Sequence, residues 1–127
     1  MAKALGVLVA EDSHDLRQFM RVMLRTLGVD AVLVEDGQKA LEAATESLFD
    51  LIFLDIQMPI RNGYSTMQEL RERGFKGLIY ALTGLTLEEG DGSRHEGFDG
   101  FLVKPVTRKD LQNVLQRAQE APQSAPT

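Results

Sequence analysis

The stretch Phe49-Asp50-Leu51-Ile52-Phe53-Leu54-Asp55, followed by Ile56-Gln57-Met58-Pro59 and then Gly63, decides the fold of this chain. Its apolar run has the length and composition of a strand that is buried on both faces. Pro59 and Gly63 indicate a turn soon after the strand. The pattern therefore places one carboxylate, that of Asp55, at the carboxyl end of a buried strand, where it is available for chemistry.

Short apolar strands alternate with amphipathic helical stretches along nearly the whole chain, which is typical of an α/β domain with a parallel sheet. We expect strands at about residues 5–10, 31–34, 49–55, 78–83 and 101–103, and helices at about 15–27, 38–47, 64–73 and 107–118. Ser13 or Asp15 can cap the first helix, and Thr107 with Asp110 has capping-box spacing at the last. Residues 1–120 are expected to form a single domain, and 121–127 a disordered tail.

The composition excludes several functions. The chain has 127 residues, enough for one domain that needs no disulfide or metal to fold, and it has no cysteine, which excludes thiol chemistry. Its 14 Lys and Arg against 19 Asp and Glu give a net charge of −5, so we expect no direct nucleic-acid partner. Because no apolar stretch reaches membrane-spanning length and no signal-peptide pattern opens the chain, we expect a cytoplasmic protein without membrane insertion.

Polar side chains stand where four of the predicted strands end, and they are Glu11, Asp12, Asp55, Thr83 and Lys104. Ligands of open parallel sheets bind at this edge. The three carboxylates would repel one another without a cation, and hard oxygen ligands favour Mg²⁺ over zinc. Such a site would allow Asp55 to attack phosphorus, with Lys104 as a positive charge and Thr83 as a hydroxyl donor.

These residues resemble the receiver domain of two-component response regulators, over about residues 5–118. The matching motifs are Glu11-Asp12, Asp55-Ile56-Gln57-Met58-Pro59 with Gly63, Ala81-Leu82-Thr83, and Gly100-Phe101-Leu102-Val103-Lys104-Pro105. The residues around them are most similar to receivers of hybrid sensor kinases and phosphorelays. The resemblance implies a doubly wound, five-stranded parallel sheet of the flavodoxin-like kind, with strand order 2-1-3-4-5.

The resemblance also implies a metal site around the acceptor. Asp55 would accept the phosphoryl group, Asp12 would bind Mg²⁺ directly, and Glu11, where Asp is commoner in the family, would act through a water. The backbone carbonyl of Gln57 would supply a further ligand.

A second group of residues would respond to the phosphoryl group. Thr83 would move towards it, Lys104 would contact it, and a cis peptide is expected before Pro105. Phe101 would take the place of the family's switch aromatic, although it lacks the hydroxyl of the frequent tyrosine.

A receiver of this kind takes its phosphoryl group from a phosphohistidine of a histidine kinase or a histidine phosphotransfer protein. It then presents a changed surface to a downstream protein or to a second copy of itself. Arg17, Arg21 and Arg25 recur every four residues on the predicted first helix, where they can form a basic stripe for docking. His14 has no partner at ligand spacing and His95 lies in a polar stretch expected to be a loop, so no internal relay through a histidine is expected.

Three other functions stay open at this point. A phosphatase of the haloacid-dehalogenase kind also uses an aspartyl nucleophile, but it needs a second acid two residues later, where this chain has Gln57. A flavodoxin-like electron carrier needs a small-residue phosphate loop after the first strand, where Glu11 and Asp12 would repel the cofactor phosphate. A receiver that only docks, without phosphorylation, also fits.

One segment departs from the family pattern. Residues 87–97 carry three glycines and no apolar period, although the family builds its fourth helix there. Each interior glycine costs about 1 kcal/mol relative to alanine, so we expect a short or frayed fourth helix.

Overall fold

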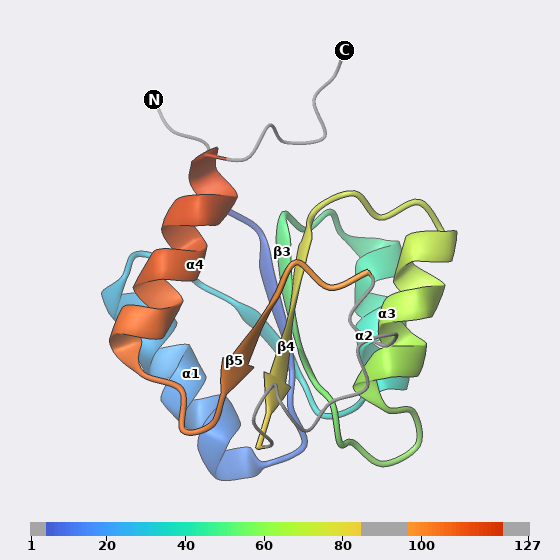
Figure 1. The fold of residues 1–127 in the computed structure, drawn as a ribbon, viewed down its shortest axis with the longest axis horizontal. Coiled ribbons are helices and arrows are strands. Elements are labelled where there is room, and N and C mark those ends of the chain that lie inside the picture. Colours follow the sequence, from blue (N-terminus) through green and yellow to red (C-terminus); the bar gives the residue numbers. More distant parts are fainter. Residues whose placement is uncertain (1–4, 85–96, 121–127) are drawn as a thin grey trace.

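The computed structural model describes residues 5–84 and 97–120, and the structural statements below concern these residues. Five strands form one parallel sheet in the order β2-β1-β3-β4-β5 (Figure 1). The strands are β1 (Val7–Ala10), β2 (Val32–Val34), β3 (Leu51–Asp55), β4 (Leu78–Thr83) and β5 (Gly100–Val103). This order confirms the expected doubly wound topology, in which the winding direction switches between β1 and β3.

Four helices cover the two faces of the sheet. They are α1 (His14–Thr26), α2 (Gly37–Glu46), α3 (Gly63–Glu72) and α4 (Arg108–Glu120). Helices α1 and α4 lie on one face, and α2 and α3 on the other (Figure 1). The fourth helix expected at 87–97 and the tail at 121–127 fall outside the described residues except for Gly97, so both stay predictions.

The central strand β3 is buried along its whole length, as its sequence predicts. Its side chains alternate between two cores. Leu51 and Phe53 belong to the core beneath α1 and α4, whereas Ile52 and Leu54 belong to the core beneath α2 and α3. Because both faces of β3 are apolar, its position in the middle of the sheet is the one that buries most surface. Asp55 is thereby fixed at the end of a strand that is buried along its whole length.

The helix starts follow the expected capping chemistry. Ser13 precedes α1, and its side-chain oxygen accepts a hydrogen bond from the Leu16 amide at 3.2 Å. Before α4, the amide of Thr107 donates to the Asp110 carboxylate at 3.0 Å, and the Asp110 amide donates to the Thr107 hydroxyl at 3.1 Å. These bonds satisfy donors that a helix leaves unpaired at its first turn. None of the described helices is long and apolar enough to cross a membrane.

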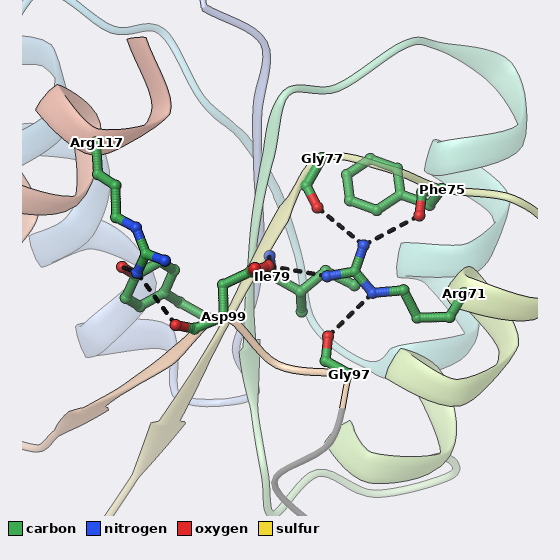
Figure 2. A network of polar contacts seen from close by, with 8 residues as sticks. Arg71, Phe75, Gly77, Ile79, Gly97, Asp99 and Arg117 are labelled. Atoms are coloured by element: carbon green, nitrogen blue, oxygen red, sulfur yellow. Dashed lines mark hydrogen bonds and ion pairs between the residues drawn. The ribbon is translucent and has the colours of Figure 1, made fainter. Parts of the chain in front are cut away.

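A polar network closes the edge of the sheet where β4 and β5 begin (Figure 2). The guanidinium of Arg71, at the end of α3, donates to the carbonyls of Phe75, Gly77 and Gly97 at 2.9–3.0 Å. It also pairs with the Asp99 carboxylate at 2.8 Å. We call Arg71, Asp99 and these three carbonyls the Arg71 clasp.

Asp99 extends the clasp across the sheet. The carboxylate oxygen that binds Arg71 also accepts the Ile79 amide at 2.8 Å, so it holds the beginnings of β4 and β5 together. From the other face, Arg117 of α4 donates to the Asp99 carbonyl at 3.1 Å and to the Tyr80 hydroxyl (Figure 2). One residue at the entry to β5 is therefore tied to helices on both faces.

Candidate functional site

The carboxyl ends of β1, β3 and β5 bring acidic and basic side chains together. Glu11, Asp12 and Asp55 each offer a carboxylate oxygen, and these oxygens lie within 4.8 Å of one another. Glu11 and Asp55 are buried, whereas Asp12 is exposed. The ammonium of Lys104, directly after β5, lies 3.2 Å from Glu11 Oε1 and 3.3 Å from Asp55 Oδ1. Four residues from three distant parts of the sequence thus form one acidic pocket.

Thr83 and Gln57 lie at the same edge of the sheet. Thr83 is the buried last residue of β4, and its carbonyl accepts the Lys104 amide at 2.8 Å, so the two residues are held side by side by the backbone. Gln57 is exposed, and its amide donates to Asp55 Oδ1 at 3.2 Å. A Cβ atom at Gly63 would lie 2.5 Å from the Asp55 carbonyl oxygen, which explains why a glycine stands there.

The electrostatics of the pocket are unbalanced, because three carboxylates face one ammonium. Burial raises the pKa of Asp55, the charge of Glu11 raises it further and Lys104 offsets only part of the increase, so that this pKa is about 7. Partial burial opposes the charge on Lys104, but Glu11 and Asp55 outweigh it and raise the pKa of the ammonium above its ordinary value. Near neutral pH, Asp55 is therefore divided between its protonated and ionised forms.

The residues of the pocket fit a hard divalent cation. Glu11 Oε1 is buried and accepts no hydrogen bond from the residues that the structure describes, although Lys104 is near it. The one ammonium of Lys104 is shared between this oxygen and Asp55 Oδ1, so the carboxylates of the pocket carry more negative charge than their cation balances. Three carboxylates with one exposed member, Asp12, give oxygen ligands together with access for water, which is the donor set that Mg²⁺ prefers.

The short segment between β1 and α1 is held by contacts that the sequence did not reveal. Glu11 Oε2 accepts the Ser13 amide at 3.0 Å. The guanidinium of Arg17 donates to the carbonyls of Glu11 at 2.8 Å and of Asp12 at 3.2 Å. Arg17, which was expected in a basic stripe with Arg21 and Arg25, is half-buried, and its guanidinium is bound to these two carbonyls. A usable signal was present, because helical side chains lean towards the N-terminus of their helix and so towards the acidic pair.

Phe101 lies on β5 beside the α3 side of the sheet and is half-buried. Its ring centroid is 5.3 Å from that of Phe98, which in turn meets the ring of Tyr64 edge-on at 5.9 Å. The peptide between Lys104 and Pro105 is cis, as expected. An aromatic row thus connects the strand before Lys104 with the first turn of α3.

Comparisons with known proteins agree with this arrangement. A family model described as "Response regulator receiver domain" matches residues 7–116. The autoinducer 1 sensor kinase/phosphatase LuxN of Vibrio campbellii is 33% identical over 109 residues, which cover 86% of this chain and 13% of LuxN. The osmosensing histidine protein kinase SLN1 of Saccharomyces cerevisiae is 33% identical over 120 residues, covering 88% of this chain and 10% of SLN1. The chain therefore spans only a small fraction of these relatives.

A solved structure extends the likeness to the pocket. The receiver domain of sensor histidine kinase PA1611 from Pseudomonas aeruginosa PAO1, crystallised with a magnesium ion in its active site cleft, is 32% identical. It covers 94% of this chain and 100% of its own, with a TM-score of 0.85.

The chain belongs to the response regulator receiver domain family. It is a phosphoacceptor domain of two-component signalling with an acidic pocket suited to Mg²⁺. As a receiver, it is not an enzyme apart from the chemistry on its own aspartate. The phosphatase and electron-carrier alternatives are thereby set aside.

Proposed function

We propose that Asp55 is the residue of this receiver that accepts the phosphoryl group. The observation that carries the proposal is the position of its carboxylate, buried at the end of β3, beside two further acids and 3.3 Å from the Lys104 ammonium. Asp12, Glu11 and the Gln57 carbonyl would hold Mg²⁺, with Glu11 acting through a water. This assignment is supported by the fit of the donor set to a hard cation.

The chemistry follows from the charges in the pocket. Bound Mg²⁺ would neutralise the crowded carboxylates and the oxygens of the incoming phosphoryl group. An oxygen of ionised Asp55 attacks phosphorus while the bond from phosphorus to the donor's imidazole nitrogen breaks, and the imidazole leaves with the bonding electron pair and is protonated by water. Lys104, already beside Asp55, offers its charge to the transferred group, and Thr83 offers its hydroxyl as a hydrogen-bond donor.

The assignment predicts a single labelled residue. After treatment with acetyl phosphate and Mg²⁺, the intact mass of the parent protein should rise by one phosphoryl group, whereas Asp55→Asn and Asp12→Ala should not gain mass. The two variants fail for different reasons. Asp55→Asn removes the nucleophile, and Asp12→Ala removes a proposed metal ligand. Intact-protein mass spectrometry measures both.

A matched control separates the pocket from the fold. Asp15→Asn, on the exposed first turn of α1, should label like the parent. Labelling that persists in Asp55→Asn would contradict the assignment. A parent protein that takes up no phosphoryl group would instead favour the receiver that docks without phosphorylation.

We also propose that the partner is a histidine kinase or histidine phosphotransfer protein that docks on α1. The exposed face of this helix carries the apolar side chains Val22, 52% exposed, and Phe19, 37% exposed, with exposed Arg21 beside them. Arg25 pairs with Asp30 at 3.3 Å, so the docking charge of the expected stripe is chiefly that of Arg21. Because such donors act in the cytoplasm, we place the domain there, with a downstream protein or a second copy as the target of its switch.

The docking proposal predicts a donor-specific defect. Arg21→Glu should slow phosphoryl transfer from the cognate protein by about tenfold, because reversing a charge at an interface edge mainly slows association. Labelling by acetyl phosphate should be unchanged, since that small donor needs no docking surface. Transfer rates from the two donors give the comparison, and equal losses with both would mean damage to the pocket or the fold.

A further inference from the structure

Arg17 makes contacts that neither a docking surface nor an ordinary helix requires. Its side-chain nitrogen Nη1 donates to the carbonyl oxygens of Glu11 at 2.8 Å and of Asp12 at 3.2 Å. In addition to these two bonds, its backbone amide makes the ordinary first helical bond of α1, to the carbonyl of Ser13 at 2.9 Å. One half-buried residue on the first turns of α1 therefore binds three consecutive carbonyls of the segment that leads out of β1.

This segment is where the backbone lacks regular partners. The last sheet bond of β1 is that from the Glu11 amide to the Val34 carbonyl at 3.1 Å, and the first helical bond of α1 is that to the Ser13 carbonyl. The carbonyls of Glu11 and Asp12 lie between the two elements. Their orientation fixes the two peptide planes on either side of Asp12, and these planes set the direction in which its exposed carboxylate points.

We propose that Arg17 is a positioning residue of the phosphoacceptor site, which fixes the backbone of the two acids Glu11 and Asp12 in the orientation that the metal ion needs. The inference rests on the proposed roles of those two acids as metal ligands. Removing a group that hydrogen-bonds to metal ligands and orients them commonly weakens metal affinity by about tenfold or more. Without that group the ligands must be ordered when the metal binds, and the lost conformational entropy reduces the binding free energy. Arg17 acts through the backbone and does not touch the ion or the phosphoryl group.

The charge of Arg17 has the opposite effect from its hydrogen bonds. A guanidinium so close to the acidic pair repels a divalent cation, so its positive charge alone would weaken metal binding. Glu35 is an acidic residue outside the pocket that senses this charge. Its pKa is lowered chiefly by the ion pair with Lys39, and the charge of Arg17 lowers it further. Two substitutions separate the effects. Arg17→Lys keeps the charge, but its ammonium lies one bond nearer the backbone than Nη1 and so falls short of the two carbonyls, whereas Arg17→Gln loses the charge as well.

The experiment measures the affinity of the metal-free protein for Mg²⁺ alone, by isothermal titration calorimetry at about pH 8, where most of Asp55 is ionised. We expect Arg17→Lys to raise the dissociation constant about tenfold. Arg17→Gln should raise it less, because the lost repulsion offsets part of the lost positioning. Arg25→Lys and Arg25→Gln, two turns further along the same helix, serve as matched controls and should leave the constant within about twofold, because Arg25 pairs with Asp30 and contacts neither carbonyl.

A second measurement distinguishes positioning from general damage. In labelling by acetyl phosphate, Arg17→Lys should require more Mg²⁺ for half-maximal rate but reach the parent's rate at saturation, and its amide NMR shifts in the metal-free state should change mainly at residues 11–13. An unchanged Mg²⁺ affinity in Arg17→Lys would overturn the inference. If Arg17→Gln then binds Mg²⁺ more tightly than the parent, the effect of Arg17 on the metal site is that of its charge alone. If the parent protein binds no Mg²⁺, the proposed metal site itself is wrong.

Discussion

At the amino ends of β4 and β5 a partly buried charge is fully matched, whereas at the carboxyl ends of the sheet the charges are in conflict. The Arg71 guanidinium donates to three carbonyls and one carboxylate, and that carboxylate, of Asp99, accepts a further amide. In the acidic pocket, by contrast, Glu11 Oε1 has no hydrogen bond among the described residues, and burial with a neighbouring charge raises the pKa of Asp55 to about 7.

The contrast indicates that the Arg71 clasp serves the stability of the fold and the acidic pocket serves ligand binding. Hydrogen-bonded charges such as those of the Arg71 clasp stabilise a fold chiefly because leaving either partner alone would be costly. In the pocket the carboxylates repel one another, and a bound cation would relieve this repulsion. The relief adds to the free energy of binding the cation. Substitutions in the Arg71 clasp should therefore change the free energy of unfolding, and substitutions in the acidic pocket should change metal binding and phosphorylation.

The largest effect on stability is expected at the clasp. Arg71→Met should lower the free energy of unfolding by about 3 kcal/mol, because it removes four hydrogen bonds and leaves Asp99 partly buried without its cation. Urea unfolding measures the change. The folded variant should still be labelled by acetyl phosphate, since the clasp lies at the opposite end of the sheet from Asp55.

The neighbouring Arg73 is a suitable control for this comparison. It is the more exposed residue just after α3, pairs with Glu69 at 3.0 Å and donates to the Thr45 hydroxyl at 3.0 Å, and because these are surface contacts Arg73→Met should cost less than about 1 kcal/mol. A clasp variant as stable as the Arg73 variant would show that the network contributes little to stability.

A smaller effect should appear in the pH dependence of stability at the pocket. The pKa of Asp55 is about 7 in the folded protein against 3.8 for an unperturbed aspartate side chain, so between these values the folded state holds a proton that the unfolded state has released. The contribution of Asp55 is thus fully present below about pH 4 and is lost as pH rises through about 7. In EDTA, the parent should lose about 2 kcal/mol between about pH 5 and about pH 8 relative to Asp55→Asn.

Two measurements test the raised pKa. Urea unfolding of parent and variant at both pH values gives the difference directly, and a difference that does not change with pH would contradict it. Added Mg²⁺ should stabilise the parent more at the higher pH than at the lower, because it binds the ionised carboxylates, and should stabilise Asp55→Asn less.

The smallest effect concerns a strained turn beside the pocket. Ile60 has a φ of 68°, and the Arg61 amide donates to the Pro59 carbonyl across it at 2.6 Å, which makes a γ-turn of the rarer hand. The side chain is 80% exposed, so little burial compensates for the strain of a β-branched residue there. Ile60→Gly should therefore stabilise the protein by about 0.5 kcal/mol, after the entropy cost of glycine is subtracted.

Thermal unfolding of Ile60→Gly and Ile60→Ala provides the test. The alanine variant keeps a Cβ atom in the left-handed region and should gain less than the glycine variant. A loss of stability in both would mean that the isoleucine makes a compensating contact.

Much of the site followed from the sequence because its residues stand at strand ends. A parallel sheet brings all its carboxyl ends to one edge, so Glu11, Asp12, Asp55 and Lys104 were expected together and are found together. The same reasoning could not predict which neighbouring residues hold the backbone of these site residues in place. Arg17 was assigned to a docking stripe from its four-residue spacing with Arg21 and Arg25, and its contact with two carbonyls depends on where α1 begins relative to β1.

The sequence by itself determined the succession of strands and helices along the chain, the capping box of α4 and the burial of β3 on both faces, because apolar period and local hydrogen bonding are encoded within a few residues. The place of β3 in the sheet was implied by the resemblance to receiver domains. Only the tertiary structure decided the Arg71 clasp, which joins α3 to Gly97, 26 residues later, and to Asp99, 28 residues later. It also decided the pKa of Asp55, since that value depends on burial and on the distance to Glu11. Both are properties of groups brought together from distant segments, and no local pattern records such distances.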